Sequence, residues 1–155
     1  MKRKVLHISM FLLLPAALMA QSPAGTSAPK LTSAYVKMLG YKGQSFKAAD
    51  AATWTLKNGV TVYSTYPYGK NIRGYMGPTP LFIAVDKTGK ISNIVAAKNQ
   101  ESPEFFVYVK PLLKAWNGKT LREAAHFKPD AVSGATFSSD AVIKTVNATA
   151  AKLSK

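Results

Sequence analysis

Residues 81–97 constrain the fold more than any other part of the chain, because two apolar segments there flank a short polar turn. Residues 81–86 (Leu-Phe-Ile-Ala-Val-Asp) form a nearly continuous apolar run, which is typical of a strand buried on both faces. Residues 87–90 (Lys-Thr-Gly-Lys) have the composition of a turn, and residues 91–97 return as the next strand. The pattern predicts a hairpin built around a buried strand.

A second hairpin is predicted upstream. Residues 54–56 and 60–63 are rich in strand-forming side chains and flank residues 57–59 (Lys-Asn-Gly). Asn-Gly favours a tight hairpin turn because both residues accept a positive φ. Residues 41–50 carry no clear signal, and residues 66–76, rich in Gly, Pro and Tyr, are expected to form a loop or an irregular strand.

Helical spacing of apolar residues predicts helices before and after these strands. Residues 31–39 form the first, which Gly40 can end. Residues 105–116 form another, kinked or restarted by Pro111. A capping box of Thr120 and Glu123 opens a short helix. The side chains expected in the core of this region are Phe105, Phe106 and Trp116.

A last helix is expected after residue 137, with Ser138 or Ser139 as its N-cap and Asp140 in its first turn. Its inner face is expected to contain Val142, Val146 and Leu153. The order of helix, strands and helices predicts an α+β fold, a twisted antiparallel sheet of hairpins packed against helices.

The N-terminus has the layout of a signal peptide at residues 1–20. Three basic residues precede an apolar run at 8–20, which ends in small residues. The run is shorter than the roughly 20 residues of a membrane span, although an uncleaved anchor is the alternative. Residues 21–30 are expected to be a linker, and residues 31–155 a single domain.

The chain carries 21 Lys and Arg against 7 Asp and Glu, a net charge of +14. Removal of residues 1–20 would leave 18 − 7 = +11. The lysines are scattered along the sequence, and only Arg3, Arg73 and Arg122 could make bidentate guanidinium contacts. An exported protein does not normally meet chromosomal DNA, so we expect no nucleic-acid partner.

Cysteine is absent, which excludes a thiolate nucleophile, a disulfide framework, a zinc ribbon and an iron–sulfur cluster. His7 and His126 are the only histidines, so a multi-histidine metal site is excluded as well. His126 stands near a predicted helix end, where a surface or capping role is expected. An organic cofactor is the remaining candidate for a redox centre.

Residues 130–139 could carry chemistry. Gly134, between Ser133 and Ala135, leaves the backbone open to close approach by a ligand. Thr136 stands just before a helix N-terminus, where N–H groups and the helix dipole favour a phosphate. The segment does not fit the P-loop pattern. The alternative interpretation is a plain helix-capping loop.

The segment Asp-Ala-Val-Ser-Gly-Ala-Thr-x-Ser at 130–138 resembles the flavinylation motif of the FMN-binding domain family. That family includes the C subunit of sodium-translocating NADH:quinone oxidoreductase, the G subunit of the Rnf complex and freestanding exported proteins. Further similar segments occur in the family's order at 74–78 (Gly-Tyr-Met-Gly-Pro), 86–91, 101–103 (Glu-Ser-Pro) and 117–119. The resemblance therefore extends over residues 74–146.

The resemblance implies FMN joined through a phosphoester to Thr136. A flavin transferase outside the cytoplasm would make this bond, using FAD and magnesium. Asp130 would serve recognition by the transferase or cap the loop. The implied cofactor site contains Ser133, Gly134, Ala135, Tyr75, Glu101 and Ser102. Glu104 departs from the family, which usually has glycine there.

The implied function is that of an exported electron carrier between redox partner proteins, including membrane-bound ones, rather than a stand-alone catalyst. Tyr75 could stack on the flavin ring, although a half-buried strand tyrosine is the alternative. A flavin-free basic module that binds a protein partner or an anionic surface is the competing function. An enzyme that reduces a small substrate is a third.

Overall fold

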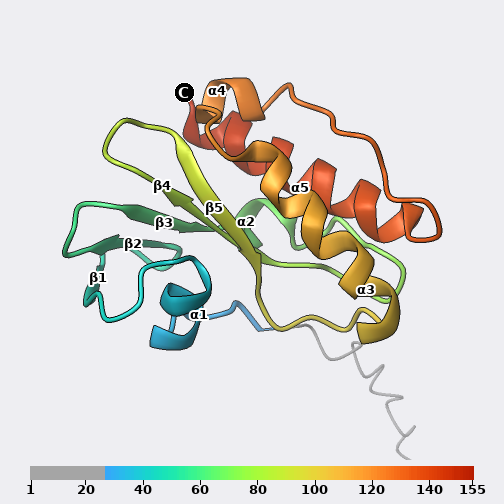
Figure 1. Cartoon of the computed structure of the whole chain (residues 1–155), viewed down its shortest axis with the longest axis horizontal. Helices are drawn as coiled ribbons and strands as arrows, with labels where there is room; N and C mark the ends of the chain where they lie inside the picture. The colour runs from blue at the N-terminus through green and yellow to red at the C-terminus, as the bar shows by residue number, and fades with distance from the viewer. Residues whose placement is uncertain (1–26) are drawn as a thin grey trace, which may run out of the picture.

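The computed structural model describes residues 27–155; the predicted signal peptide at 1–20 and most of the linker at 21–30 lie outside the described residues. Five strands form one antiparallel sheet in which each strand pairs with its neighbour in sequence (Figure 1). The strands are β1 (Phe46–Ala48), β2 (Thr53–Leu56), β3 (Thr61–Ser64), β4 (Leu81–Val85) and β5 (Ile91–Ala96). With the helices described below, this confirms the predicted α+β fold.

The helices cover both faces of the sheet. They are α1 (Ser33–Met38), α2 (Tyr66–Gly69), α3 (Pro103–Val109), the 3₁₀ helix η1 (Lys110–Trp116), α4 (Leu121–Ala124) and α5 (Thr136–Leu153). Figure 1 shows α3 and α5 on one side of the strands and α1 on the other. The sheet is therefore the middle of three layers.

All five residues of β4 are buried, as the apolar run predicts. Successive side chains of a strand point to opposite faces, so β4 contributes to two separate cores. Leu81 and Ile83 belong to the core under the helices, whereas Phe82 and Ala84 belong to the core under α1. The apolar run is continuous because neither face of β4 meets water.

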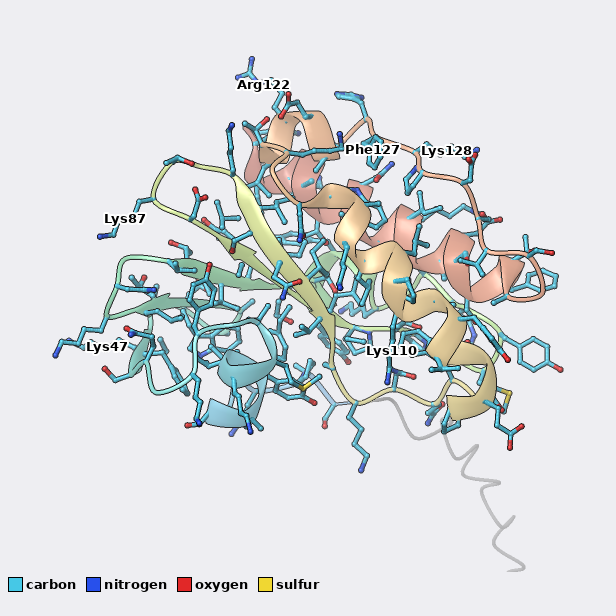
Figure 2. All side chains as sticks on the ribbon, in the orientation of Figure 1. Lys47, Lys87, Lys110, Arg122, Phe127 and Lys128 are labelled. Carbon is cyan, nitrogen blue, oxygen red and sulfur yellow. The ribbon has the colours of Figure 1, made fainter. Side chains whose placement is uncertain are left out.

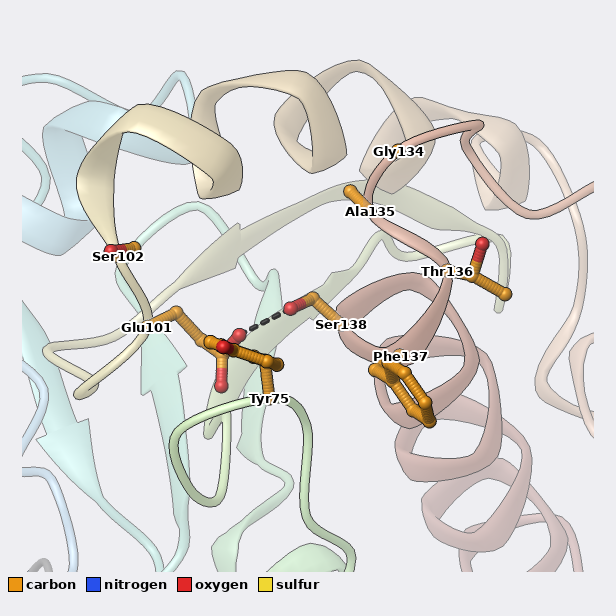
Figure 3. A pocket seen from close by; sticks show the side chains of 8 residues that line it. All are labelled: Tyr75, Glu101, Ser102, Gly134, Ala135, Thr136, Phe137 and Ser138. Carbon is orange, nitrogen blue, oxygen red and sulfur yellow. Dashed lines mark hydrogen bonds between the residues drawn. The ribbon is translucent and has the colours of Figure 1, made fainter.

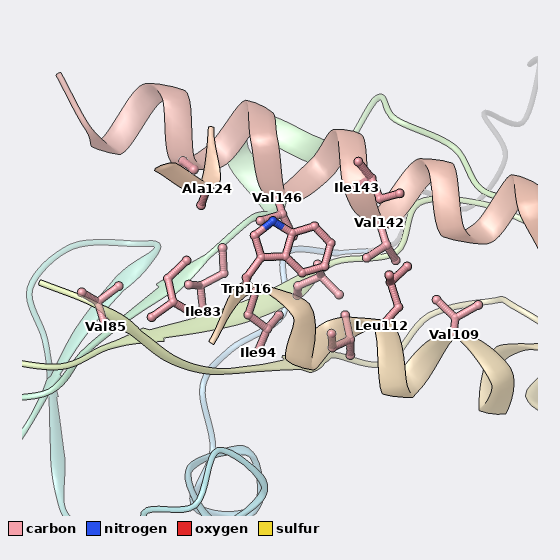
Figure 4. Packing of buried hydrophobic residues seen from close by; sticks show 14 of the residues in the cluster. Ile83, Val85, Ile94, Val109, Leu112, Trp116, Ala124, Val142, Ile143 and Val146 are labelled. Atoms are coloured by element: carbon pink, nitrogen blue, oxygen red, sulfur yellow. The ribbon is translucent and has the colours of Figure 1, made fainter. Parts of the chain in front are cut away.

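The core under the helices is centred on Trp116, which is fully buried. Figure 4 shows its indole between the sheet and α5, with Ile83 and Ile94 on one side and Val146 on the other. Phe106, Val142 and Val146 are buried as predicted, and Leu153 is half-buried. This packing seats α5 against the sheet. The side chain of Phe105 lies outside the described part of the chain.

The two predicted hairpins are confirmed, but the turn geometry expected at Asn58 is wrong. Among the described residues only glycines have a positive φ, including Gly59 at +83° and Gly89 at +80°. In both turns the glycine N–H donates to the carbonyl three residues back, at 2.8 Å and 3.0 Å. Asn58 instead accepts a 3.3 Å hydrogen bond from the N–H of Val60 through its side chain, which stabilises the turn without a left-handed asparagine.

The predicted break at Pro111 and the capping box are both confirmed. The α-helical bonding of α3 ends at Val109, and the chain continues through Pro111 as η1. The Thr120 hydroxyl accepts from the N–H of Glu123 at 3.2 Å, and the Glu123 carboxylate accepts from the N–H of Thr120 at 2.7 Å.

Two elements carry no clear sequence signal. The expected loop at 66–76 contains the four-residue helix α2, which Pro67 favours because its ring fixes φ near the helical value. Gly69 is the last residue of α2 and packs against α5. A Cβ added at Gly69 would lie 2.6 Å from the side chain of Thr145. Strand β1, within the uninformative residues 41–50, is a mostly exposed edge strand formed by pairing with β2.

Candidate functional site

Helix α5 begins at Thr136 with Ala135 as its N-cap residue, three to four residues earlier than the sequence indicates. The predicted capping by Ser138 or Ser139 is wrong, and Asp140 lies beyond the first turn. Both serines are buried within the helix, and their hydroxyls are engaged elsewhere. Their side chains are therefore recruited by the tertiary structure and do not cap the helix.

The hydroxyl of Ser139 accepts a 3.1 Å hydrogen bond from the N–H of Val132, which ties the loop back onto the helix. Gly134 adopts a φ of +79°, so the chain reverses there. The N–H of Ala135 then donates to the carbonyl of Val132 at 3.0 Å. This arrangement leaves the side chain of Thr136 exposed at the first helical position.

A pocket of about 260 Å³ opens beside this helix start (Figure 3). Three segments far apart in the sequence meet there: the loop before β4, the loop before α3 and the first turn of α5. Six of the eight predicted site residues line it, and they are Tyr75, Glu101, Ser102, Gly134, Ala135 and Thr136. Ser133 and Asp130 are exposed on the loop and do not line the pocket.

Glu101 connects the walls of the pocket. Its side chain is buried, and Oε1 accepts hydrogen bonds from the N–H groups of Met76 at 2.9 Å and Gly77 at 3.3 Å. Oε2 accepts from the hydroxyl of Ser138 in α5, as Figure 3 shows. One carboxylate thus joins the loop of residues 74–77 to the first turn of α5.

Gly74 makes room for this carboxylate. A Cβ added at Gly74 would lie 2.8 Å from Oε1 of Glu101, closer than ordinary packing allows. The N–H of Gly74 also donates to the carbonyl of Gly77 at 2.8 Å, which closes the loop that presents Tyr75. The expected half-buried strand tyrosine is wrong, because Tyr75 lies in a loop and is 69% exposed.

Sequence reasoning missed two residues that line the pocket, Phe137 and Ser138. Phe137 is 73% exposed, which is unusual for a phenylalanine within a helix that packs on a core. Phe137 directly follows Thr136 in the sequence, and this position indicates a place beside the cofactor. The sequence predicts a capping role for Ser138, and only the folded structure shows that its hydroxyl donates to Glu101.

A model of the FMN-binding domain family matches residues 74–151, half of the chain. The chain belongs to the FMN-binding domain family. The matched residues include β4, β5 and every segment that lines the pocket, which agrees with the resemblance predicted over 74–146. No curated protein matches the chain. Membership makes this a flavin-binding protein whose ligand is FMN.

The pocket of this FMN-binding domain suits the two chemical parts of FMN. The first N–H groups of a helix have no partner within it and attract phosphate, and Thr136 stands at that position in the 18-residue α5. Tyr75 and Phe137 offer exposed aromatic surface at the pocket, where a flavin ring could pack. The residues present therefore fit both the phosphate and the ring.

His126 does not line the pocket. His126 is exposed just after α4, in agreement with the expected surface role. Within residues 27–155, no group of three or more His, Asp or Glu side chains could hold a metal ion. No helix in that part of the chain is long and apolar enough to cross a membrane.

Proposed function

We propose that this protein is an exported electron carrier whose FMN is joined through a phosphoester to Thr136. The observation that carries the proposal is the position of the Thr136 hydroxyl. It is exposed, stands at the first residue of α5 and lines the pocket that fits FMN. A phosphate attached there would sit among free helix N–H groups, which stabilise its negative charge.

The attachment requires a separate flavin transferase, because an unactivated threonine hydroxyl is a weak nucleophile. In the proposed step, the Thr136 oxygen attacks the FMN phosphorus of FAD and the bond between the two phosphates breaks. AMP leaves, and the hydroxyl proton passes to a base of the transferase. Exposure of Thr136 and of Asp130 in the same loop leaves both accessible to such an enzyme.

The bound FMN supplies the redox chemistry, and the protein supplies position and partner contacts. Exposed apolar side chains surround the pocket: Tyr75 is 69%, Met76 51% and Phe137 73% exposed. Such side chains are typical of protein interfaces. They support electron exchange with partner proteins that dock at the pocket.

The test is co-expression with a flavin transferase in the presence of magnesium, followed by intact-mass measurement. The expected gain is the mass of FMN less one water, and Thr136→Ala should abolish it. Thr55→Ala is the matched control, because it removes an exposed threonine hydroxyl outside the motif and should keep the adduct. An adduct that persists in Thr136→Ala would refute the assignment.

Export is tested separately by cell fractionation of the full chain. The mature protein is expected in the extracytoplasmic fraction, with the mass of residues 1–20 removed. Retention at full length in the membrane fraction would instead support the uncleaved anchor. Because the transferase acts outside the cytoplasm, the adduct is measured on protein from the extracytoplasmic fraction. Exported protein without the adduct would overturn the attachment alone, and protein retained in the cytoplasm would overturn export.

A further inference from the structure

The positive charge of the chain is distributed unevenly over its surface. The turn after β2 and the turn after β4 lie side by side at one end of the sheet, because Thr61 pairs with Val85. The side chain of Lys87 reaches across Gly59, where an added Cβ would lie 2.6 Å from Lys87 Cε. Two lysine-bearing turns that are separate in sequence thus form one surface.

Further lysines extend this surface on both sides. The edge strand β1 adds a lysine opposite Thr55, and residues 117–120 pair with the start of β5. Figure 2 labels Lys47 and Lys87 at the same end of the domain. We call this surface the basic end, and its lysines are Lys47, Lys57, Lys87, Lys90 and Lys119.

One arginine, Arg122, and two carboxylates accompany these lysines, so the basic end has a net charge of 5 + 1 − 2 = +4. Asp86 accepts hydrogen bonds from Thr88 and Lys90 of its own turn, and Glu123 belongs to the capping box. Both are charged at neutral pH, and these bonds lower the pKa of each carboxyl further below its ordinary value. The excess of positive charge persists when they are counted.

The segments that frame the flavin pocket have the opposite charge. Residues 73–78, 101–109 and 130–143 contain one basic residue, Arg73, which pairs with Pro78 in the first loop. They contain four of the seven carboxylates of the chain, namely Glu101, Glu104, Asp130 and Asp140. In Figure 1 the first turns of α3 and α5 lie at the end of the domain opposite the two hairpin turns. The domain is therefore electrically polar along its length.

We infer that the basic end docks on an anionic lipid membrane and directs the flavin pocket away from it. Protein interfaces are enriched in Arg and aromatic residues and depleted in Lys. The two turns of the basic end contain lysines and no arginine, and none of the exposed large apolar side chains of residues 27–155 belongs to them. Exposed lysines on turns suit a diffuse layer of lipid headgroups better than a shaped protein surface.

The uneven charge distribution separates membrane attachment from partner binding. Lipid headgroups attract one end of the domain, while the apolar side chains around the pocket remain free for a redox partner. An acidic pocket region would be repelled by the same membrane, so the orientation has electrostatic support from both ends. The inference does not depend on the flavin, because the lysines lie outside the pocket.

The test is co-sedimentation of the full-length protein with vesicles of phosphatidylcholine, with and without phosphatidylglycerol. The triple variant Lys57→Gln, Lys87→Gln, Lys90→Gln should bind the anionic vesicles about a hundredfold more weakly, since each surface lysine contributes about fivefold. The matched control is the triple variant Lys110→Gln, Lys128→Gln, Lys144→Gln. It loses the same charge from exposed positions elsewhere and should bind nearly as tightly as the parent protein.

The parent protein and all variants have the same residues 1–26, so differences in vesicle binding between them measure the contribution of the substituted lysines. Equal losses in the two triple variants would overturn the inference, as would an equal loss by the first triple variant on vesicles with and without phosphatidylglycerol. Binding to an acidic protein or polymer but not to the vesicles would also overturn it. The same assay on Thr136→Ala should match the parent protein, which keeps this result separate from the outcome for flavin attachment.

Discussion

Replacement of Glu101 by alanine is expected to destabilise the protein by about 3 kcal/mol. The carboxylate accepts from the N–H groups of Met76 and Gly77 and from the hydroxyl of Ser138. Gly77 and Ser138 are buried, so their donors would lose a partner without ready access to water. An unsatisfied buried donor costs about 1–3 kcal/mol, whereas the exposed Met76 can be rehydrated.

Two further variants separate hydrogen bonding from charge. Glu101→Gln retains an oxygen for the two backbone donors and presents an amide to the Ser138 hydroxyl, so we expect a loss of about 1 kcal/mol. Glu104→Ala is the matched control, because it removes an exposed carboxylate three residues further along. Its only expected cost is about 0.5 kcal/mol, from loss of the favourable interaction of a negative charge with the first turn of α3.

The assay is equilibrium urea unfolding followed by tryptophan fluorescence. Trp116 and Trp54 are buried in the two different cores, so the signal reports unfolding on both faces of the sheet. The reasoning is refuted if Glu101→Ala and Glu104→Ala reduce the free energy of unfolding equally. It is also refuted if glutamine at position 101 is as damaging as alanine, because charge rather than hydrogen bonding would then dominate.

Three other substitutions test neighbouring features. Gly74→Ala should cost about 1 kcal/mol by displacing the Glu101 carboxylate, and this cost should vanish in the Glu101→Ala background; unfolding of the double mutant measures the coupling. Gly134→Ala should lower the free energy of unfolding by about 1 kcal/mol, because its φ of +79° is strained for alanine although space is open; an unchanged urea midpoint would contradict this. The pKa of Asp86 is lowered below 3.8, and the largest cause is the hydrogen bond from the Thr88 hydroxyl. The stability that the ionised Asp86 adds is therefore present at neutral pH and lost as pH falls through its folded pKa. Thr88→Ala should raise that pKa toward 3.8 in an NMR titration, and an unchanged titration would show that the bond does not form in solution.

Much of the fold follows from local patterns in the sequence. The five apolar residues of β4 predict a strand with no wet face, and the glycines of the two turns mark where the chain reverses. Pro111 and the pair of Thr120 and Glu123 act on their own helices within a few residues. These signals are reliable because the interactions that they describe are local.

Strand β1 and the start of α5 could not be predicted in the same way. β1 forms because β2 offers it an edge, and its own residues contain little pattern. Ser138 and Ser139 have the composition of a helix cap, but partners elsewhere engage their hydroxyls. A tertiary hydrogen bond from a buried group outweighs a local preference when both compete for the same hydroxyl.

The sequence alone determined the family, the α+β fold and the loop that contains Thr136, because an ordered set of short motifs and hydrophobic periodicity suffice for these. Only the tertiary structure decided that Glu101 joins the loop of residues 74–77 to α5 and so completes the pocket. Only it gathers scattered lysines at one end of the sheet and the acidic segments at the other. The physical reason is the same in both cases: antiparallel pairing brings distant segments together, and neither burial of a carboxylate nor a charge gradient is encoded within any one segment.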